Sequence, residues 1–420
     1  MALGRRLGWL TYLGPGLLLA ATGVGAGDLA TGAFAGSILG TRVLWAVFAG
    51  AFLKFTVNEG LARWQLLTGS TLLEGVARHL GKPVCYAFGL YLVGWSFFVG
   101  SALVSACGVT MHALRPLWGP EYDKVIYGVS HSAIALAVVW WGGYPAFEKV
   151  MRICVAMMFF SVLLAAGAIR PPVGELLQGS LIPTIAPKSE SWRWTVALMG
   201  GVGGTVTILC YGYWIREEKR EAPRWLAACR WDLASGYLMT ALFGAGMVVL
   251  GSRIPAEGRG ARLIVTLADQ LQQALGPWGT TMRWVFLAGA WAAVFSSLLG
   301  VWQSVPYLFA DVWRLVATPR GARAPLPDTR SGPYRLYLLA IATVPLLGLR
   351  FQFQQIQQTY AIVGACFLPL VALLLAWLNG WSGLLPPHRR NSTITTIVLL
   401  ATCLFFLCYG WIEVRYQIGG

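Results

Sequence analysis

At residues 22–28 the chain reads TGVGAGD, and at residues 200–205 it reads GGVGGT. Both runs lie inside apolar segments that are long enough to cross a bilayer. Glycine costs a helix interior about 1 kcal/mol relative to alanine, and each unsatisfied backbone group in lipid costs several kcal/mol. The two runs therefore predict two interrupted helices with a transport site between them. The alternative is close helix packing, because both runs contain the small-xxx-small spacing.

Composition places the chain in a membrane. Of its 420 residues, 57% are hydrophobic and 12% are charged, and the mean hydropathy is +0.62. These values exclude a soluble globular protein. The first apolar stretch carries Gly and Asp at its centre, so we interpret it as a retained helix and not as a signal peptide. About eleven stretches are expected to span the bilayer, at residues 8–39, 43–66, 84–108, 124–142, 146–169, 191–215, 230–251, 281–313, 335–350, 354–379 and 393–415.

The order of these stretches divides the chain into two halves and an additional helix. A half led by an interrupted helix spans residues 1–169, an outer loop spans 170–190, and a second such half spans 191–380. The eleventh helix and the C-terminus occupy residues 381–420. Because each half has an odd number of crossings, the halves are expected to lie in opposite orientations, as an inverted repeat. Residues 253–278 are expected to form an outer loop with a short surface helix.

The net charge of +15 comes from basic residues at the ends of the spans, where anionic lipid headgroups attract them. The densest basic clusters, at residues 216–230 and 314–335, fall on the same side as the N-terminus. The positive-inside rule therefore predicts a plasma-membrane (cell inner membrane) protein with a cytoplasmic N-terminus and an external C-terminus. The bilayer and a small substrate are the expected partners, nucleic acid is not, no cofactor is expected, and a monomer is sufficient.

Neither cysteine nor histidine forms a chemical motif. The eight Cys lie almost entirely within or beside apolar spans, and nothing resembles a disulfide framework or a CxxC motif. We expect them to be small core residues. An enzyme is not expected, because no nucleophile arrangement is visible. The four His make no cluster with Cys or carboxylates: His79, His112, His131 and His388.

Asp28 is the ionisable residue that most directly indicates a site. An acid at bilayer depth marks a pathway or a binding site by default, and a helix break exposes backbone groups that replace the hydration of an ion. With Thr22, Thr205 and Thr207, Asp28 would form an all-oxygen metal site, which suits hard cations. Capping of the second half-helix is the alternative role of Asp28, and the two roles are compatible. The expected substrate site is completed by Gly25, Ala26 and Gly204.

Lys54 lies near the middle of the second span and is expected to neutralise a carboxylate. The candidates are Asp28, Glu59 and Asp232. Next to Asp28, the ammonium would act as a built-in cation and weaken the case for a bound metal. Four charged residues toward the cytoplasmic side are expected to form either a gate network or a set of static salt bridges: Glu59, Arg63, Arg230 and Asp232.

Several stretches resemble the Nramp family of divalent metal transporters. They are residues 14–16 (GPG), residues 25–31 (GAGDLAT), residues 43–69 in the second span and residues 203–206 (GGTV). The resemblance implies an all-α integral membrane protein with a leucine-transporter-like five-plus-five inverted repeat, in which helices 1 and 6 are discontinuous. It also implies metal-ion transport by alternating access.

The chain departs from this family at the metal ligands. The family's Asp-Pro-Gly-Asn motif reads GAGD at residues 25–28, and its Met-Pro-His motif reads TIL at residues 207–209. A second sixth-helix histidine falls at Trp214, and third-helix acids associated with proton transfer fall near Gly94 and Phe97. Loss of the thioether removes the soft ligand that favours manganese or iron. A hard cation such as magnesium is therefore the predicted substrate.

Two alternatives to a cation transporter stay open. Loss of the metal ligands leaves space for a small organic solute, transported without coupling to metal or protons. Tyr211, Tyr213 and Trp214 could then stack on an organic cation, although interface anchoring is the other role of such aromatics. The second alternative is a transport-incompetent relative that acts as a sensor or scaffold.

Overall fold

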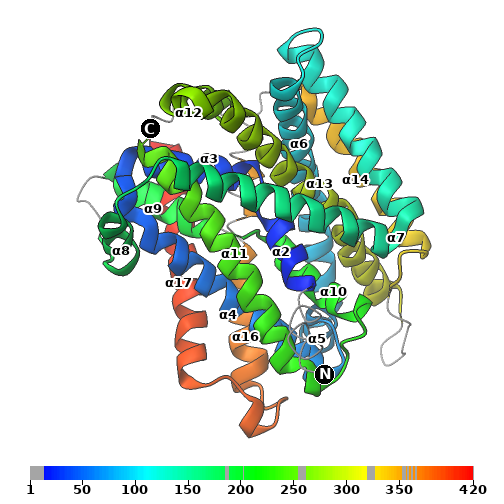
Figure 1. Cartoon of the computed structure of the whole chain (residues 1–420). Coiled ribbons are helices and arrows are strands. Elements are labelled where there is room, and N and C mark those ends of the chain that lie inside the picture. Colours follow the sequence, from blue (N-terminus) through cyan, green and yellow to red (C-terminus); the bar gives the residue numbers. More distant parts are fainter. Residues whose placement is uncertain are drawn as a thin grey trace, which may run out of the picture.

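In the computed structural model, helices joined by turns and short connections make up the part of the chain that it describes, with no strand in that part (Figure 1). The described residues are 14–184, 189–201, 203–253, 262–318, 327–351, 356, 359–360, 363–364 and 367–419. Among them, six helical stretches are long and apolar enough to cross a membrane. Two of the six contain an interruption that separates two crossings, at the 3₁₀ turn Gly40–Val43 and at Gly143, whose backbone is not helical.

The elements of the first half are α2 (Pro15–Gly23), α3 (Ala26–Leu39), η2 (Gly40–Val43), α4 (Leu44–Thr68), α5 (Leu72–Leu80), α6 (Lys82–Leu114) and α7 (Pro120–Ala168). After α8 (Val173–Leu181), the second half contains α9 (Ser189–Gly201), η3 (Val206–Cys210), α10 (Tyr211–Glu217), η4 (Pro223–Trp225), α11 (Leu226–Arg253), α12 (Arg262–Ala274), η5 (Gly276–Trp278), α13 (Gly279–Ala317), α14 (Gly332–Thr343), η6 (Val344–Arg350) and α16 (Phe367–Ala376). The chain continues through the π-helical turn η7 (Trp377–Trp381) and η8 (Pro387–Arg389) into α17 (Thr393–Gly419).

The first interrupted helix consists of α2 and α3. Pro15 begins α2, where its missing N–H costs nothing, and the helix ends at Gly23. Val24 and Gly25 are extended, and α3 begins directly at Ala26. The break is therefore confined to Val24 and Gly25, a shorter stretch than the run of residues 22–28.

The second interrupted helix consists of α9, η3 and α10, and its break has a different backbone. Gly203 and Gly204 have φ values of +85° and +79°. Residues with a Cβ rarely adopt this left-handed region, so glycine is required at both positions. The chain then resumes as the 3₁₀ turn η3 before it becomes α-helical at Tyr211.

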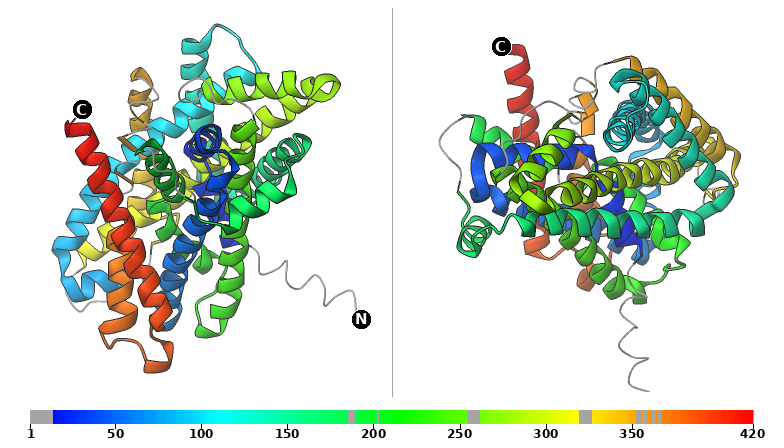
Figure 2. Two further views of the ribbon diagram at one scale, coloured as in Figure 1. Left: turned by 90° about the vertical axis from the view of Figure 1, so that its left-hand side faces the viewer. Right: turned by 45° about the horizontal axis from the view of Figure 1, so that its top comes forward.

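The short helix α2 lies at the centre of the bundle, where it packs against α7, α11 and α13. On its far side α3 packs against α9 and α11, so each broken helix is supported by continuous helices. The hairpin of α16 and α17 packs against α4, and Figure 2 shows it along one flank of the molecule. The long helix α13 contacts the short helix α12 and the short helix α5. We use α12 and α5 to mark the opposite ends of the bundle. We name them the α12 end and the α5 end.

Two connecting segments contain helices of their own, and one expected span is described only in part. The segment 170–190, expected as an outer loop, contains the helix α8, whose Gly179 packs so closely on the backbone of Thr41 that a Cβ would lie 2.0 Å from the carbonyl oxygen. The short helix expected within residues 253–278 is α12. The span expected at residues 354–379 falls partly outside the described residues, and its described helix is α16.

Candidate functional site

The two helix breaks meet backbone to backbone. A Cβ at Gly23 would lie 2.7 Å from the carbonyl carbon of Gly203, and a Cβ at Gly204 would lie 3.3 Å from the Cα of Gly23. The glycines of the first run are therefore needed for close approach, and those of the second run for both close approach and a left-handed backbone. The packing interpretation and the helix-break interpretation of these runs are thus both correct.

Serine side chains of α13 hold the first break. The Ser297 hydroxyl is within hydrogen-bonding distance of the carbonyl oxygens of Thr22, at 2.8 Å, and Val24, at 3.0 Å. Ser296 donates to the Ala21 carbonyl at 3.1 Å. These carbonyls have no hydrogen-bond donor within their own helix because the helix ends there. The serine hydroxyls of α13 lie where they can donate to them.

Asp28 uses only one of its carboxylate oxygens for capping. Its Oδ2 accepts the N–H of Gly25 at 3.0 Å, which caps the start of α3. Its Oδ1 is buried and has no hydrogen-bond partner among the described residues. A cavity of about 10 Å³ adjoins the carboxylate and has room for a single water molecule. The unpaired oxygen makes Asp28 a candidate ligand for a cation.

Lys54 reaches the second break from α4. Its side chain is fully buried, and its Nζ donates to the carbonyl oxygens of Gly200 and Gly204, both at 2.8 Å. Among the three carboxylates considered for it, Asp28 is the one with which it interacts electrostatically. The structure thus brings the ammonium to the breaks, although the two side chains do not form an ion pair within 4.0 Å.

Two threonines of the second break present hydroxyl groups. Thr207 Oγ1 is buried without a hydrogen-bond partner in the described structure, next to the backbone of Gly204. The Thr205 hydroxyl is buried beside that of Tyr360, which is also within electrostatic reach of Asp28. Tyr360 is a neighbour that sequence reasoning missed, because no pattern marks which aromatic of the tenth span faces the breaks.

The other expected ligands are placed differently. The Thr22 hydroxyl donates to Leu18 within its own helix, at 2.7 Å, and packs against Gly300, where a Cβ would lie 2.0 Å from the oxygen. It does not join Asp28, because an internal helix bond is available one turn earlier. Gly25 contributes backbone alone, and the side chain of Ala26 lies outside the described residues.

The four charged residues expected near the cytoplasmic side form two separate groups at the α5 end. Glu59 pairs with Arg63 at 3.1 Å and with Arg230 at 2.7 Å, which links α4 to α11. Asp232 instead accepts the N–H groups of Gly14 and Gly16, at 3.0 and 2.9 Å, at the start of α2. Further contacts of Asp232 come from Tyr211, at 3.1 Å, and Arg220, at 3.6 Å.

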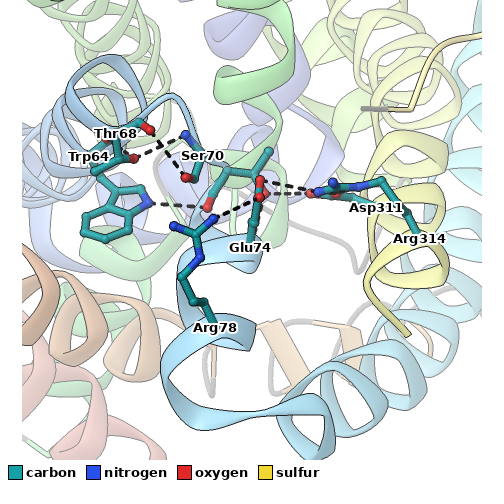
Figure 3. A network of polar contacts seen from close by, with 8 residues as sticks. Trp64, Thr68, Ser70, Glu74, Arg78, Asp311 and Arg314 are labelled. Atoms are coloured by element: carbon teal, nitrogen blue, oxygen red, sulfur yellow. Dashed lines mark hydrogen bonds and ion pairs between the residues drawn. The ribbon is translucent and has the colours of Figure 1, made fainter. Parts of the chain in front are cut away.

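A third polar group at the α5 end was not anticipated. The buried Asp311 of α13 accepts hydrogen bonds from Thr71 and Tyr213, both at 2.7 Å, and pairs with Arg314 at 2.7 Å. Figure 3 shows that Glu74 lies beside this group, with its carboxylate between the guanidinium groups of Arg314 and Arg78. The sequence did contain a signal, since Asp311 is an acid inside an apolar span with Arg314 three residues later.

The aromatic residues beside the second break do not form a stacking surface. Tyr211 and Tyr213 donate their hydroxyls to Asp232 and Asp311, and Trp214 donates to Gln303 at 2.7 Å. All three side chains are buried. Their polar groups hold α10 in place, and this arrangement gives no support to an aromatic site for an organic cation. Within the described residues, no group of three or more His, Cys, Asp and Glu could hold a metal.

Comparison with known proteins agrees with this architecture. The family model described as "Natural resistance-associated macrophage protein-like" matches residues 16–412. The "Divalent metal cation transporter MntH" of Aeromonas hydrophila is 24% identical over 259 residues, which cover 58% of this chain and 59% of that protein. The chain thus spans about three fifths of the length of the curated relatives that it matches.

Two solved structures share the fold. A manganese transporter of Eremococcus coleocola has a TM-score of 0.78 at 15% identity, covering 98% of this chain and 87% of that one. MhsT in complex with L-phenylalanine has a TM-score of 0.61 at 14% identity, covering 94% of this chain and 97% of that one. Together with the two broken helices and the family match over nearly the whole length, these likenesses identify the chain as an integral membrane protein that belongs to the Nramp family.

Proposed function

We propose that the protein is a secondary-active transporter of a hard divalent cation. The cation binds between the two helix breaks, the first between α2 and α3 and the second between α9 and η3. The observation that supports this most is the pair of buried oxygen atoms without a partner, Asp28 Oδ1 and Thr207 Oγ1, at the place where the half-helices meet. A buried oxygen without a hydrogen bond costs free energy, so a bound cation would remove that cost. Relatives described as divalent metal cation transporters support a metal-ion substrate.

The ligand atoms favour magnesium over manganese or iron. Asp28, Thr205 and Thr207 offer a carboxylate and two hydroxyls, and magnesium prefers such hard oxygen ligands and retains part of its water shell. The position that corresponds to the family's Met is Thr207, so the thioether that would favour a transition metal is missing there.

Transport would proceed by alternating access. The ion would be held by α3 and η3 while the α5 end opens and closes around α2 and α10. We propose that the protein lies in the plasma membrane, with the α5 end and the N-terminus in the cytoplasm and the C-terminus outside. A monomer would be sufficient for transport. The 170–190 and 381–420 segments would connect and flank the two five-helix halves.

Calorimetry on the purified protein tests this proposal. We expect Mg²⁺ to bind, Mn²⁺ to bind no more tightly, and Asp28→Asn to weaken Mg²⁺ binding by at least about tenfold, because the variant loses the negative charge. Absence of binding by both ions, or an unchanged affinity in Asp28→Asn, would contradict the proposal. Proteoliposome flux of Mg²⁺ then separates a transporter from a transport-incompetent relative, and stabilisation by amines but not by metals would favour an organic solute.

A further inference from the structure

Lys54 occupies a position at the second break that a bound cation could take. Its Nζ lies 2.8 Å from the carbonyl oxygens of Gly200 and Gly204. The first is in the last turn of α9 and the second is in the break, so neither has a full set of helix partners. Carbonyls at a helix C-terminus carry partial negative charge and attract cations. The chain thus supplies its own cation to these oxygens.

The same ammonium balances the charge of the candidate site. Asp28 is the acid with which Lys54 interacts. The acids nearest to the break along α4 and α11 have other partners, since Glu59 pairs with Arg63 and Arg230, and Asp232 lies beside Arg220. The candidate site therefore combines one acidic and one basic side chain. A divalent ion that approaches Asp28 also approaches the ammonium, which repels it.

We propose that Lys54 is a specificity-determining residue, a tethered cation that competes with the transported ion for the carbonyl oxygens of the second break and for the charge of Asp28. This inference rests on the proposed function and adds the reason why the substrate must carry two charges. A monovalent ion offers no electrostatic advantage over the ammonium, whereas a divalent ion of small radius does. Binding of the substrate would displace Lys54 from Gly204 and so loosen the link between α4 and the second half.

Neutral variants at this position provide the test. Lys54→Met removes the charge and retains the length of the side chain, and Lys54→Gln also retains hydrogen-bond donors for the break carbonyls. Both variants are expected to bind Mg²⁺ at least about tenfold more tightly than the native protein, and to bind Na⁺ measurably, because the competing charge is lost. Lys54→Arg retains the charge and is expected to keep the native affinity. A gain in affinity is not what the loss of a purely structural contact would produce.

Lys124→Met is the matched control, because Lys124 is also buried but pairs with Glu121 at the start of α7, away from the breaks. It should leave Mg²⁺ affinity unchanged. If folded Lys54→Met or Lys54→Gln binds Mg²⁺ with native or weaker affinity, the competition is overturned while the proposed function stands. If neither the native protein nor any Lys54 variant binds a divalent ion, the proposed function itself fails. In Asp28→Asn/Lys54→Met, the gain should disappear, because the acid for which the two cations compete is absent.

Discussion

Thr207 is a residue at which the proposed binding site can be tested directly. Its Oγ1 is buried and has no partner in the described structure, so it lowers stability by about 1–3 kcal/mol relative to a satisfied group. Such a group calls for an explanation, and an ion or a water molecule bound there provides one. Asp28 Oδ1 is in the same situation, at the other break.

Thr207→Val should therefore separate stability from binding. Without Mg²⁺ the melting temperature is expected to stay the same or rise, since the variant buries a methyl group in place of an unpaired hydroxyl. Affinity for Mg²⁺ is expected to fall about tenfold, because one ligand is lost. Thr207→Ser keeps the hydroxyl and is the control. A lower melting temperature together with native Mg²⁺ affinity would show that the hydroxyl serves the fold and not an ion.

At the scale of elements, the first break depends on the helix that supports it. The carbonyls of Thr22 and Val24 have no helix partner, and the Ser297 hydroxyl lies within 2.8 and 3.0 Å of them. Support of this kind fixes where the half-helices α2 and α3 separate. Because the support comes from α13, the shape of the first break is coupled to the second half of the chain.

Ser297→Ala should destabilise the protein by about 1–3 kcal/mol, because buried carbonyls lose their donor. Thermal or denaturant unfolding would measure this change. Ser304→Ala, on the same helix, is the control, since Ser304 donates to Gly300 within α13 itself. Equal effects of the two substitutions would mean that the break does not rely on Ser297.

How much of these elements could be predicted from sequence depends on the range of the interactions. The breaks were predictable because glycine and Asp28 disagree with an apolar helix locally. The contact of Lys54 with Gly200 and Gly204 joins residues about 150 positions apart, and nothing in the local pattern of α4 indicates it. The same holds for Asp311, whose partners Thr71 and Tyr213 lie at the start of α5 and on α10. Thr22 differs, because its bond to Leu18 is local and sequence reasoning placed its hydroxyl at the break instead.

At the scale of the whole molecule, three buried polar networks lie at the α5 end. Asp232 ties the start of α2 to α11, Glu59 ties α4 to α11, and Asp311 ties α13 to α5 and α10. The opposite end has a groove of about 520 Å³ beside η2 and α8, with the exposed ion pair of Glu175 and Arg253. Under the proposed alternating access, the contacts of these networks would hold the α5 end closed.

Asp232→Ala should shift the molecule toward opening at the α5 end. The native Cys229 is a suitable reporter, because it is buried one turn before Asp232 and would become accessible on opening. In a variant with Cys229 as its single cysteine, loss of the Asp232 contacts, about 1–3 kcal/mol, should raise the rate of maleimide labelling about 5- to 150-fold. Labelling kinetics in detergent or in proteoliposomes measure this rate directly.

A reporter at the other end distinguishes alternating access from local loosening. Ser252 lines the groove at the α12 end, so a single cysteine introduced by Ser252→Cys should label more slowly when Asp232→Ala is added. A transporter that exposes its site to one side at a time couples the two ends in opposite senses, whereas local disruption around Asp232 changes Cys229 alone. Glu175→Gln, which breaks the exposed pair with Arg253, should change neither reporter strongly, because an exposed pair contributes little. Faster labelling at Cys229 with an unchanged rate at residue 252 would show that the Asp232 contacts close only one end and do not belong to a two-state movement of the bundle.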